Sequence, residues 1–436
     1  MVGHVLLMAT VLCLTELSQI KHMSKKVKDS VHNSNVRNKN LLPLVEKILS
    51  KKNSFIDLVN KHKTPFYVYD QEGIDESIKH FTKAFSAHIP NFQSYYAVKL
   101  NHHPFLVNRV IEKGMGLDVA SKRELLIAIK AGATKIVYFS PGKNENDLRY
   151  ALKYADIVRI HIDSFGELEK LGEISNKMKK SVEVGIRINI PSHGLWSKYG
   201  IPLKSLKNFW RKANNYPFVK LNGIHFHRSR NRTAHSYTSI ICELAKYLTK
   251  HFSSSERERI QYIDFGGGFE PYDSEGVLVS KHLKWPRYKI LTPFTIEEYA
   301  QAIGNSIKKY LDPIIKATYL SEPGRYICNN AMHIVLSVAD VKDKENCVLN
   351  SGMNMVGWQR FESEYFPLIN ITHPGKKEQR YRMWGNLCAT WDIWGYYCYA
   401  SKLLEKDIIV VPCQGALTYS LAQSFINDIP PVYAIE

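Results

Sequence analysis

Eight short β-rich runs, separated by amphipathic helical stretches, follow one another through most of this chain. The runs are YYAVK (95–99), LDVAS (117–121), IVYFS (136–140), IVRIHID (157–163), EVGIRIN (183–189), GIHFH (223–227), YIDFGG (262–267) and TYLSEPG (318–324). The helical stretches include KRELLIAIKAGA (122–133) and TSIICELAKYLTKHF (238–252). Strands and helices that alternate in this way predict a parallel sheet, and eight such units predict an α/β fold of the (β/α)8, TIM-like barrel type.

A second, β-rich part follows the eighth run. Its strand-like segments are HIVLSVADV (333–341), CVLNSG (347–352) and DIIVVP (407–412). The early segment PFYVYD (65–70) is also strand-like, and it either pairs with this part or leads into the barrel. We predict a lead-in segment at 41–70, a barrel at 71–327 and a C-terminal β-sandwich or β-barrel domain at 328–436. A chain of 436 residues, 44% of them hydrophobic, can bury two such cores.

The N-terminal 40 residues lie outside this pattern. Val5 to Leu14 is apolar but too short to span a bilayer. It is either a signal peptide or the product of a start site placed too early, with Met23 as the true beginning. Residues 24–40 are polar and rich in Asn and Lys, which predicts a disordered arm.

Charge and cysteine content exclude several classes of protein. The formal net charge is +18, but Lys and Arg are spread along the chain and no basic run alternates with stacking aromatics. We therefore expect no nucleic-acid partner and no membrane partner, and a surface that favours anionic ligands. The seven Cys form no C-x-x-C pair and show no metal-ligand spacing, so we expect no disulfide framework, no metal and a reducing compartment, the cytoplasm.

Barrel enzymes place their chemistry at the C-terminal ends of the strands. Lys99 closes the first run, where desolvation would lower the pKa of its amine and make it a nucleophile toward a carbonyl group. The same sequence pattern also fits a lysine whose side chain extends from the strand end into solvent.

Two further strand ends carry candidate ligand-binding groups. Asp264 to Phe269 contains three successive glycines, whose bare backbone can approach a phosphate, in the place where barrels commonly bind one. In Ser321 to Arg325, Glu322 could hold a pyridine nitrogen in its protonated form, although Glu322 and Arg325 could also form a surface ion pair. His227 closes the sixth run and could lie against a cofactor ring, or could be a core histidine.

Taken in order, these motifs resemble the fold type III decarboxylases that depend on pyridoxal 5'-phosphate (PLP), a group with alanine-racemase-like barrels that contains diaminopimelate, ornithine and carboxynorspermidine decarboxylases. The resemblance covers residues 64–430. Its further motifs are Thr64 to Tyr69, Tyr96 to Asn101, Gly116 to Ser121 with Glu124, Asp163-Ser164, Arg187 to Asn189, Ser197 to Gly200, Ser351 to Asn354 and Gly385 to Cys388.

The resemblance implies a role for each of these residues. Lys99 would hold the PLP, His227 would stack on its ring, and Glu322 would meet the pyridine nitrogen. Gly266, Gly267, Gly268 and Arg325 would cradle the phosphate, with Asp118, Arg187 and Gly324 also around the cofactor. Cys388 would donate a proton, as a residue that reaches the cofactor of the other subunit, which implies a homodimer with shared active sites. Cys388 could instead be a buried structural thiol.

This chain departs from the family at three places. The usual His-Ile-Gly-Ser is His227-Arg228-Ser229-Arg230 here, the acid that follows the cysteine in diamine-specific relatives is Ala389, and the phosphate-binding tyrosine is Leu417, with Tyr419 two residues on. We expect Arg230, Cys388, Ala389 and Tyr365 to contact the substrate.

These departures point to the substrate class. Ala389 cannot accept a distal ammonium, and arginines after the sixth run favour an anion. The sequence therefore predicts an amino-acid decarboxylase for a substrate with a second carboxylate, such as diaminopimelate or a siderophore or polyamine precursor. A cofactor-free homologue that only binds a partner, and a racemase, are the alternatives.

Overall fold

The structure is a computed structural model. It describes residues 40–189, 198–271, 276–280, 287–357, 364–365, 367–375 and 377–435, with only the backbone of 276–280, 287–290, 364–365 and 396–397. The expectations for the N-terminal arm and the apolar stretch fall on residues 1–39 and lie outside the described residues. Among the described residues, no helix is long and apolar enough to cross a membrane.

Eight parallel strands close into a barrel, as the sequence predicted. They are β2 (Phe92–Ala97), β3 (Gly116–Val119), β4 (Ile136–Phe139), β5 (Val158–Ile162), β6 (Val182–Asn189), β8 (Val219–His225), β9 (Tyr262–Asp264) and β12 (Thr318–Ser321). The order β5-β4-β3-β2-β12-β9-β8-β6 is closed by pairing of β5 with β6, and the short β7 (Ile201–Pro202) adds to β6. The strands are apolar along most of their length because side chains and helices cover both faces.

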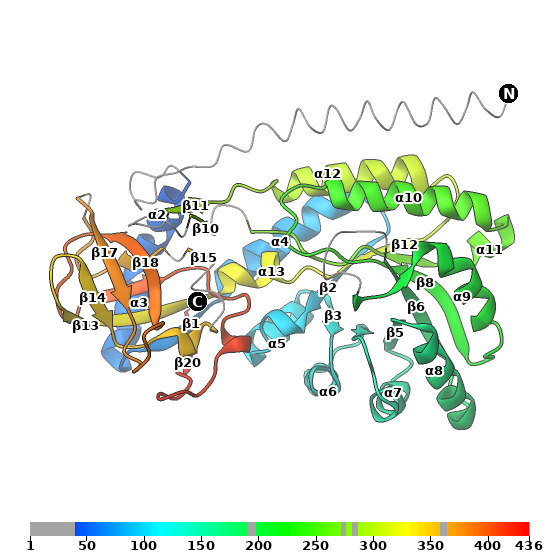
Figure 1. Ribbon diagram of the computed structural model, residues 1–436, viewed down its shortest axis with the longest axis horizontal. Coiled ribbons are helices and arrows are strands. Elements are labelled where there is room, and N and C mark those ends of the chain that lie inside the picture. The colour runs from blue at the N-terminus through cyan, green and yellow to red at the C-terminus, as the bar shows by residue number, and fades with distance from the viewer. Residues whose placement is uncertain are drawn as a thin grey trace.

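Helices surround the barrel (Figure 1). They are α4 (Gln71–His88), α5 (Pro104–Glu112), α6 (Lys122–Lys130), α7 (Glu145–Leu152), α8 (Phe165–Met178), α9 (Leu206–Ala213), α10 (His235–His251), α11 (Ser254–Glu258), α12 (Ile296–Ser306) and α13 (Arg325–Cys328). Several begin at a polar cap that follows a strand: Ser121, Ser164 and Thr295 each accept a backbone N–H of the first turn. Such caps fix where each strand-to-helix loop ends.

The C-terminal part forms a mixed eight-stranded sheet. Its strands are β1 (Phe66–Asp70), β13 (Met332–Val341), β14 (Asn346–Leu349), β16 (Ile369–Asn370), β17 (Gln379–Trp384), β18 (Ile393–Ala400), β19 (Ile408–Val411) and β20 (Val432–Ile435). β1 lies between β13, to which it is antiparallel, and β20, to which it is parallel. The early strand-like segment therefore pairs with the β domain. A separate three-stranded sheet joins β10 (Gly276–Ser280), β11 (Arg287–Ile290) and β15 (Glu364–Tyr365).

Two short helices, α2 (Leu42–Ser50) and α3 (Lys52–Lys61), pack on one face of this sheet. Their apolar residues, such as Val45 and Phe55, share a hydrophobic cluster with strand residues including Val335. Lys51 between them donates to both carboxylate oxygens of the buried Asp70, at 2.8 and 2.7 Å. The lead-in segment is therefore part of the β domain's packing.

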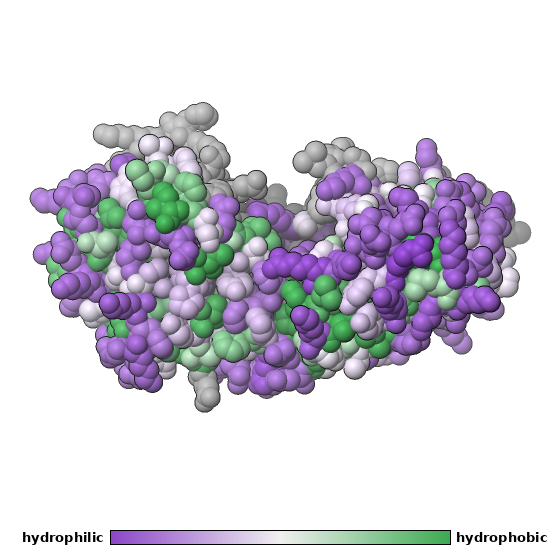
Figure 2. All heavy atoms as spheres, turned by 90° about the horizontal axis from the view of Figure 1, so that it is seen from below, coloured by the Kyte–Doolittle hydropathy of each residue, from purple (hydrophilic) through white to green (hydrophobic). Residues whose placement is uncertain are grey.

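The molecule has two lobes, with the β domain and the barrel side by side (Figure 1). In the view from below, hydrophobic residues form small groups between hydrophilic ones, and a notch lies between the lobes (Figure 2).

Candidate active site

Lys99 lies at the open end of the barrel, in a 3-10 turn (Val98–Leu100) directly after β2. Its Nζ is 2.8 Å from Oδ2 of Asp118 at the end of β3, and its side chain is 42% exposed while that of Asp118 is 2% exposed. The expected lowering of the Lys99 pKa is wrong. Burial by itself would lower this pKa, but the negative charges of Asp118 and Glu322 outweigh it and raise the pKa above its usual value.

The pKa of Asp118 also depends on its neighbours. Burial and the nearby Glu322 raise the pKa of Asp118 to about 7, although Lys99 acts in the opposite direction. The two side chains therefore form a close ion pair within one polar cluster, at the end of the barrel where the strands terminate.

The triple-glycine turn directly follows β9, and only bare backbone fits there. Gly266 and Gly268 have φ of +71° and +96°, which glycine adopts without strain. A Cβ on Gly267 would lie 2.1 Å from the Glu322 carbonyl oxygen, and one on Gly268 1.9 Å from that of Arg228. The turn is held by Gly266 N–H, which donates to Asp264 at 2.8 Å, and by Gly267 N–H, which donates to His227 Nδ1 at 3.1 Å.

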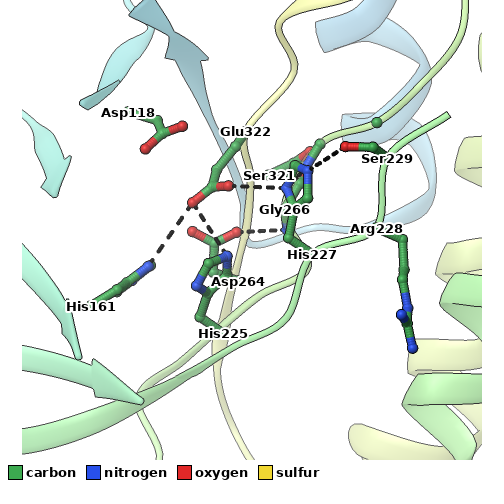
Figure 3. A network of polar contacts seen from close by, with 12 residues as sticks. Asp118, His161, His225, His227, Arg228, Ser229, Asp264, Gly266, Ser321 and Glu322 are labelled. Atoms are coloured by element: carbon green, nitrogen blue, oxygen red, sulfur yellow. Dashed lines mark hydrogen bonds and ion pairs between the residues drawn. The ribbon is translucent and has the colours of Figure 1, made fainter. Parts of the chain in front are cut away.

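Glu322 follows β12 and forms the centre of a buried network (Figure 3). Its backbone N–H donates to Gly266 at 2.9 Å, which ties it to the glycine turn. Its carboxylate is close to three histidine rings: His227 Nδ1 at 3.4 Å, His225 Nε2 at 3.5 Å and His161 Nδ1 at 3.9 Å. Burial by itself would raise the Glu322 pKa, but the neighbouring His225 outweighs burial and holds this pKa well below its usual range.

The sequence interpretation did not single out His161, His225 and Asp264 as part of this network. His161 lies on β5 and His225 ends β8, and both rings are completely buried. Burial and the nearby Glu322 raise the pKa of Asp264 well above its usual range. The available signal was a histidine inside each of two otherwise apolar runs, IVRIHID and GIHFH.

Two predicted arginines lie near the same end of the barrel. Arg187 on β6 lies between the rings of Phe139 and Tyr199, with its guanidinium carbon 4.3 and 4.5 Å from their centroids. Arg325 begins α13, and its Nε is 3.6 Å from Oε2 of the buried Glu270. Gly324 precedes it, and a Cβ there would lie 2.7 Å from the Leu100 side chain.

The predicted residues of the β domain are not part of this network. Cys388 and Ala389 lie on the loop between β17 and β18, where Cys388 is exposed. None of the hydrogen bonds and ion pairs described for Glu322 involves that loop. Tyr365 belongs to β15, which pairs with β10, and its side chain lies outside the described residues.

The residues at which this chain differs from the family pattern also have defined positions. Arg228 points away from the carboxylate cluster (Figure 3) and lines a small pocket together with Arg187, Tyr199 and His227. Arg230 is exposed and adopts a left-handed φ of +54°. Leu417 lies beside the Lys99 turn, where its N–H donates to Leu100 at 2.9 Å, and Tyr419 packs near the rings of His102 and His103.

These residues fit PLP. Lys99 offers an amine at the barrel mouth, and Oε1 of the buried Glu322 makes no hydrogen bond within the described part of the chain. The side-chain-free turn allows a phosphate to approach the backbone. Arg325 brings a guanidinium, a group whose N–H donors bind anions, to the same end of the barrel.

Comparisons with known proteins agree with this chemistry. Residues 73–329 match the family model of the pyridoxal-dependent decarboxylases, pyridoxal binding domain. The chain is 27% identical to diaminopimelate decarboxylase of Aquifex aeolicus over 85% of this chain and 86% of that protein. It is 23% identical to 2-[(L-alanin-3-ylcarbamoyl)methyl]-2-hydroxybutanedioate decarboxylase of Staphylococcus aureus, over 85% and 94%. The crystal structure of diaminopimelate decarboxylase from M. jannaschii with L-lysine has the same fold, with a TM-score of 0.76, 22% identity and coverage of 87% and 89%.

Proposed function

Because this chain belongs to the pyridoxal-dependent decarboxylase family, we propose that it is a PLP-dependent carboxy-lyase that decarboxylates an amino acid bearing a second carboxylate. The observation that carries the proposal is the convergence of Lys99, Glu322 and the triple-glycine turn at one end of the barrel. The names of the relatives support catalysis over the partner-binding and racemase alternatives.

Each residue of the site has a distinct task in this proposal. A bound PLP would supply an electron sink for the electron pair of the Cα–carboxylate bond. Lys99 holds the cofactor, and Glu322 accepts a hydrogen bond from its ring nitrogen. The backbone of Gly266 to Gly268 and the guanidinium of Arg325 bind the phosphate, while His227 lies against the ring. Asp118, Arg187 and Gly324 complete the surroundings, and Cys388 returns a proton to Cα.

Purified protein mixed with PLP should show an absorption band near the visible edge, and borohydride should fix the cofactor on Lys99. Lys99→Ala should lose both the band and the adduct, which peptide mass spectrometry measures. Lys130→Ala, on the outer face of α6, is the control and should retain both. An unchanged spectrum of wild type with added PLP, together with an unmodified Lys99 after reduction, would contradict the proposal.

The substrate class follows from two local features. Ala389 provides no acid for a distal ammonium, and Arg228, Arg230 and Arg232 add positive charge after β8. The relatives named above act on substrates whose names denote two or more carboxylates. We therefore assign Arg230, Cys388, Ala389 and Tyr365 to the substrate, and a distal carboxylate to the arginine group.

A substrate panel tests this assignment. We expect kcat/KM for diaminopimelate-like or carboxylate-bearing substrates to exceed that for lysine and ornithine, and Arg230→Ala to reduce this preference by about tenfold, the effect of one charged hydrogen bond. Arg211→Ala on α9 is a control for lost surface charge. Faster decarboxylation of ornithine or lysine, or an Arg230→Ala variant that weakens PLP binding while preference is unchanged, would contradict the anionic-substrate proposal.

A homodimer with shared sites completes the proposal. Next to the Cys388 loop, the C-terminal segment exposes large apolar side chains, including Leu421 (49%), Phe425 (40%) and Ile426 (60%). Asn427 donates to Asn386 at 3.0 Å, which holds this segment against the loop. A second copy that covers these side chains would bring Cys388 to the partner's barrel. No disulfide joins the six cysteines that the structure describes, and the cytoplasm is the location that we propose.

A further inference from the structure

The buried carboxylate of Glu322 needs hydrogen-bond donors, and its two oxygens face different histidines (Figure 3). Oε2 is 3.4 Å from His227 Nδ1, while Oε1 is 3.5 Å from His225 Nε2 and 3.9 Å from His161 Nδ1. Only a nitrogen that carries a hydrogen can donate to a carboxylate. A ring can therefore stabilise the Glu322 carboxylate only if the nitrogen that faces the carboxylate carries a hydrogen.

His227 cannot donate a hydrogen bond to Glu322 from its Nδ1. The N–H of Gly267 donates to His227 Nδ1 at 3.1 Å, and His227 Nε2 lies 3.2 Å from Ser229 Oγ. A nitrogen that accepts an amide hydrogen carries none of its own in the neutral ring. Burial lowers the pKa of His227 to about 4, so the ring is neutral at physiological pH. The donors to Glu322 must come from elsewhere.

His225 and His161 are the remaining rings. Both are completely buried, their centroids are 4.6 Å apart, and none of their four nitrogens makes a hydrogen bond with another described residue. Burial and the proximity of the two rings hold the pKa of His161 well below its usual value, and burial also lowers that of His225. Each neutral ring has one N–H, and an N–H with no other described acceptor can be directed at Oε1.

The surroundings make these donors necessary. Asp118 and Asp264 are acids beside Glu322, and the nearby cations are Lys99, which is paired with Asp118, and Arg187. A buried carboxylate without donors takes up a proton. A protonated Glu322 could not hold the ring nitrogen of PLP in the protonated form.

We propose that His225 and His161 are positioning residues for Glu322: their imidazole N–H groups face Oε1 at 3.5 and 3.9 Å, and their electrostatic attraction keeps the carboxylate ionised and fixes its orientation without a hydrogen bond that would occupy the oxygen. This inference rests on the proposed function, because an ionised Glu322 is what makes PLP an electron acceptor.

Substitution of His225 tests the role in the loaded enzyme. His225→Leu removes the donor, so kcat should fall about 10- to 100-fold while KM and the Kd for PLP change less than about threefold. The absorption spectrum of bound PLP should change as the ring nitrogen loses its proton. His225→Gln, which keeps an N–H, should recover most of kcat and the wild-type spectrum.

Tyr262→Phe is the matched control. The Tyr262 ring stacks on His161 at 5.8 Å inside the barrel, and its buried hydroxyl makes no hydrogen bond with a described residue. This variant should keep wild-type kcat and spectrum. Equal losses in His225→Leu, His225→Gln and Tyr262→Phe would overturn the proposal, because a merely structural role would produce that pattern.

A second measurement uses wild-type apoprotein and does not depend on catalysis. Nitrogen-15 NMR of the histidine side chains should show His225 as the neutral tautomer with hydrogen on Nε2 between pH 5 and 8. A charged ring, or hydrogen on Nδ1 alone, would overturn the proposal even where a variant fails to fold. Failure of wild type to bind PLP would contradict the proposed function and leave this tautomer result to stand by itself.

Metal titration covers one further outcome. His161, His225 and Glu322 form a buried group whose ligand atoms lie within 4.8 Å of one another. Apoprotein should take up no stoichiometric Zn²⁺. Uptake of one equivalent that is lost in His161→Leu would overturn the proposal, because the two rings would then act as metal ligands.

Discussion

Neutral buried histidines make the stability of this protein depend on pH. Burial, as the main cause, lowers the pKa of His161, His225 and His227, whereas in the unfolded chain these rings titrate near 6.5. As pH falls below 6.5, the unfolded chain binds protons that the folded chain does not. The stabilisation from these neutral rings is therefore complete above about pH 6.5 and is lost below it.

His161→Asn should make the free energy of unfolding less dependent on pH between pH 5 and 6, by about 1.4 kcal/mol per pH unit, the effect of one proton. Urea unfolding at several pH values measures this. Asp118, whose pKa is raised to about 7, has the opposite effect and adds stability at low pH. Asp118 is present in wild type and in His161→Asn, so its contribution to the pH dependence cancels when the two proteins are compared. Equal slopes would show that His161 is charged in the folded state.

The residues of the site that stand at strand ends could be predicted from the sequence. Lys99, the glycine turn and Glu322 each follow a strand, and the barrel brings strand ends together. His161 and His225 could not be assigned from sequence, because their place beside Glu322 depends on which way strand residues point into the barrel. The rise in the Lys99 pKa was also missed, since it requires Asp118 at 2.8 Å.

Within the barrel, β6 and β8 leave room for one large ring from β9. A Cβ on Gly223 would lie 2.0 Å from the Tyr262 ring, and one on Gly185 2.6 Å from its hydroxyl. Tyr262 is 2% exposed, so its ring has no route outward. The two glycines therefore set how these strands pack around the barrel axis.

Gly223→Ala should destabilise the protein by about 3 kcal/mol or more, because overpacking of a closed core forces its neighbours to move. Gly166→Ala on α8, where a Cβ meets nothing within 4 Å, is the matched control and should be neutral or slightly stabilising. Thermal unfolding measures both.

Tyr262→Leu in the Gly223→Ala background should recover part of the loss, so that the double variant is more stable than the sum of the two changes predicts. Additive effects would mean that the strain lies elsewhere in the strand.

Many of the strands could be predicted from the sequence. All eight barrel strands fall within or next to the predicted apolar runs, and β1, β13, β14 and β19 match the four strand-like segments of the β domain. The short β7, β10, β11, β15 and β16 were not predicted, because pairing partners define such short strands. β17, β18 and β20 of the β domain were not predicted either. The helices α2 and α3 were not separately predicted either, since their packing depends on the sheet of the β domain.

At the scale of the whole molecule, shared sites predict rescue between inactive chains. Lys99→Ala and Cys388→Ala homodimers should both be inactive. After equal mixing and subunit exchange, about half the dimers are mixed and one of their two sites is intact, so about a quarter of wild-type activity should return. Activity assays after exchange measure this, with subunit exchange confirmed by differently tagged chains. No recovery despite exchange would argue against a shared site.

The pairing of β1 with β20 affects the order in which the molecule can be completed. β1 leaves the ribosome before any barrel strand, whereas β20 is synthesised after all of them. Every barrel strand lies between them in the chain, so the barrel has all of its strands while the polypeptide is still attached. The β domain does not, because one edge of β1 has no parallel neighbour until β20 has been synthesised. Completion of the β domain, and of any dimer surface formed by the segment next to β20, therefore comes after synthesis of all the barrel strands.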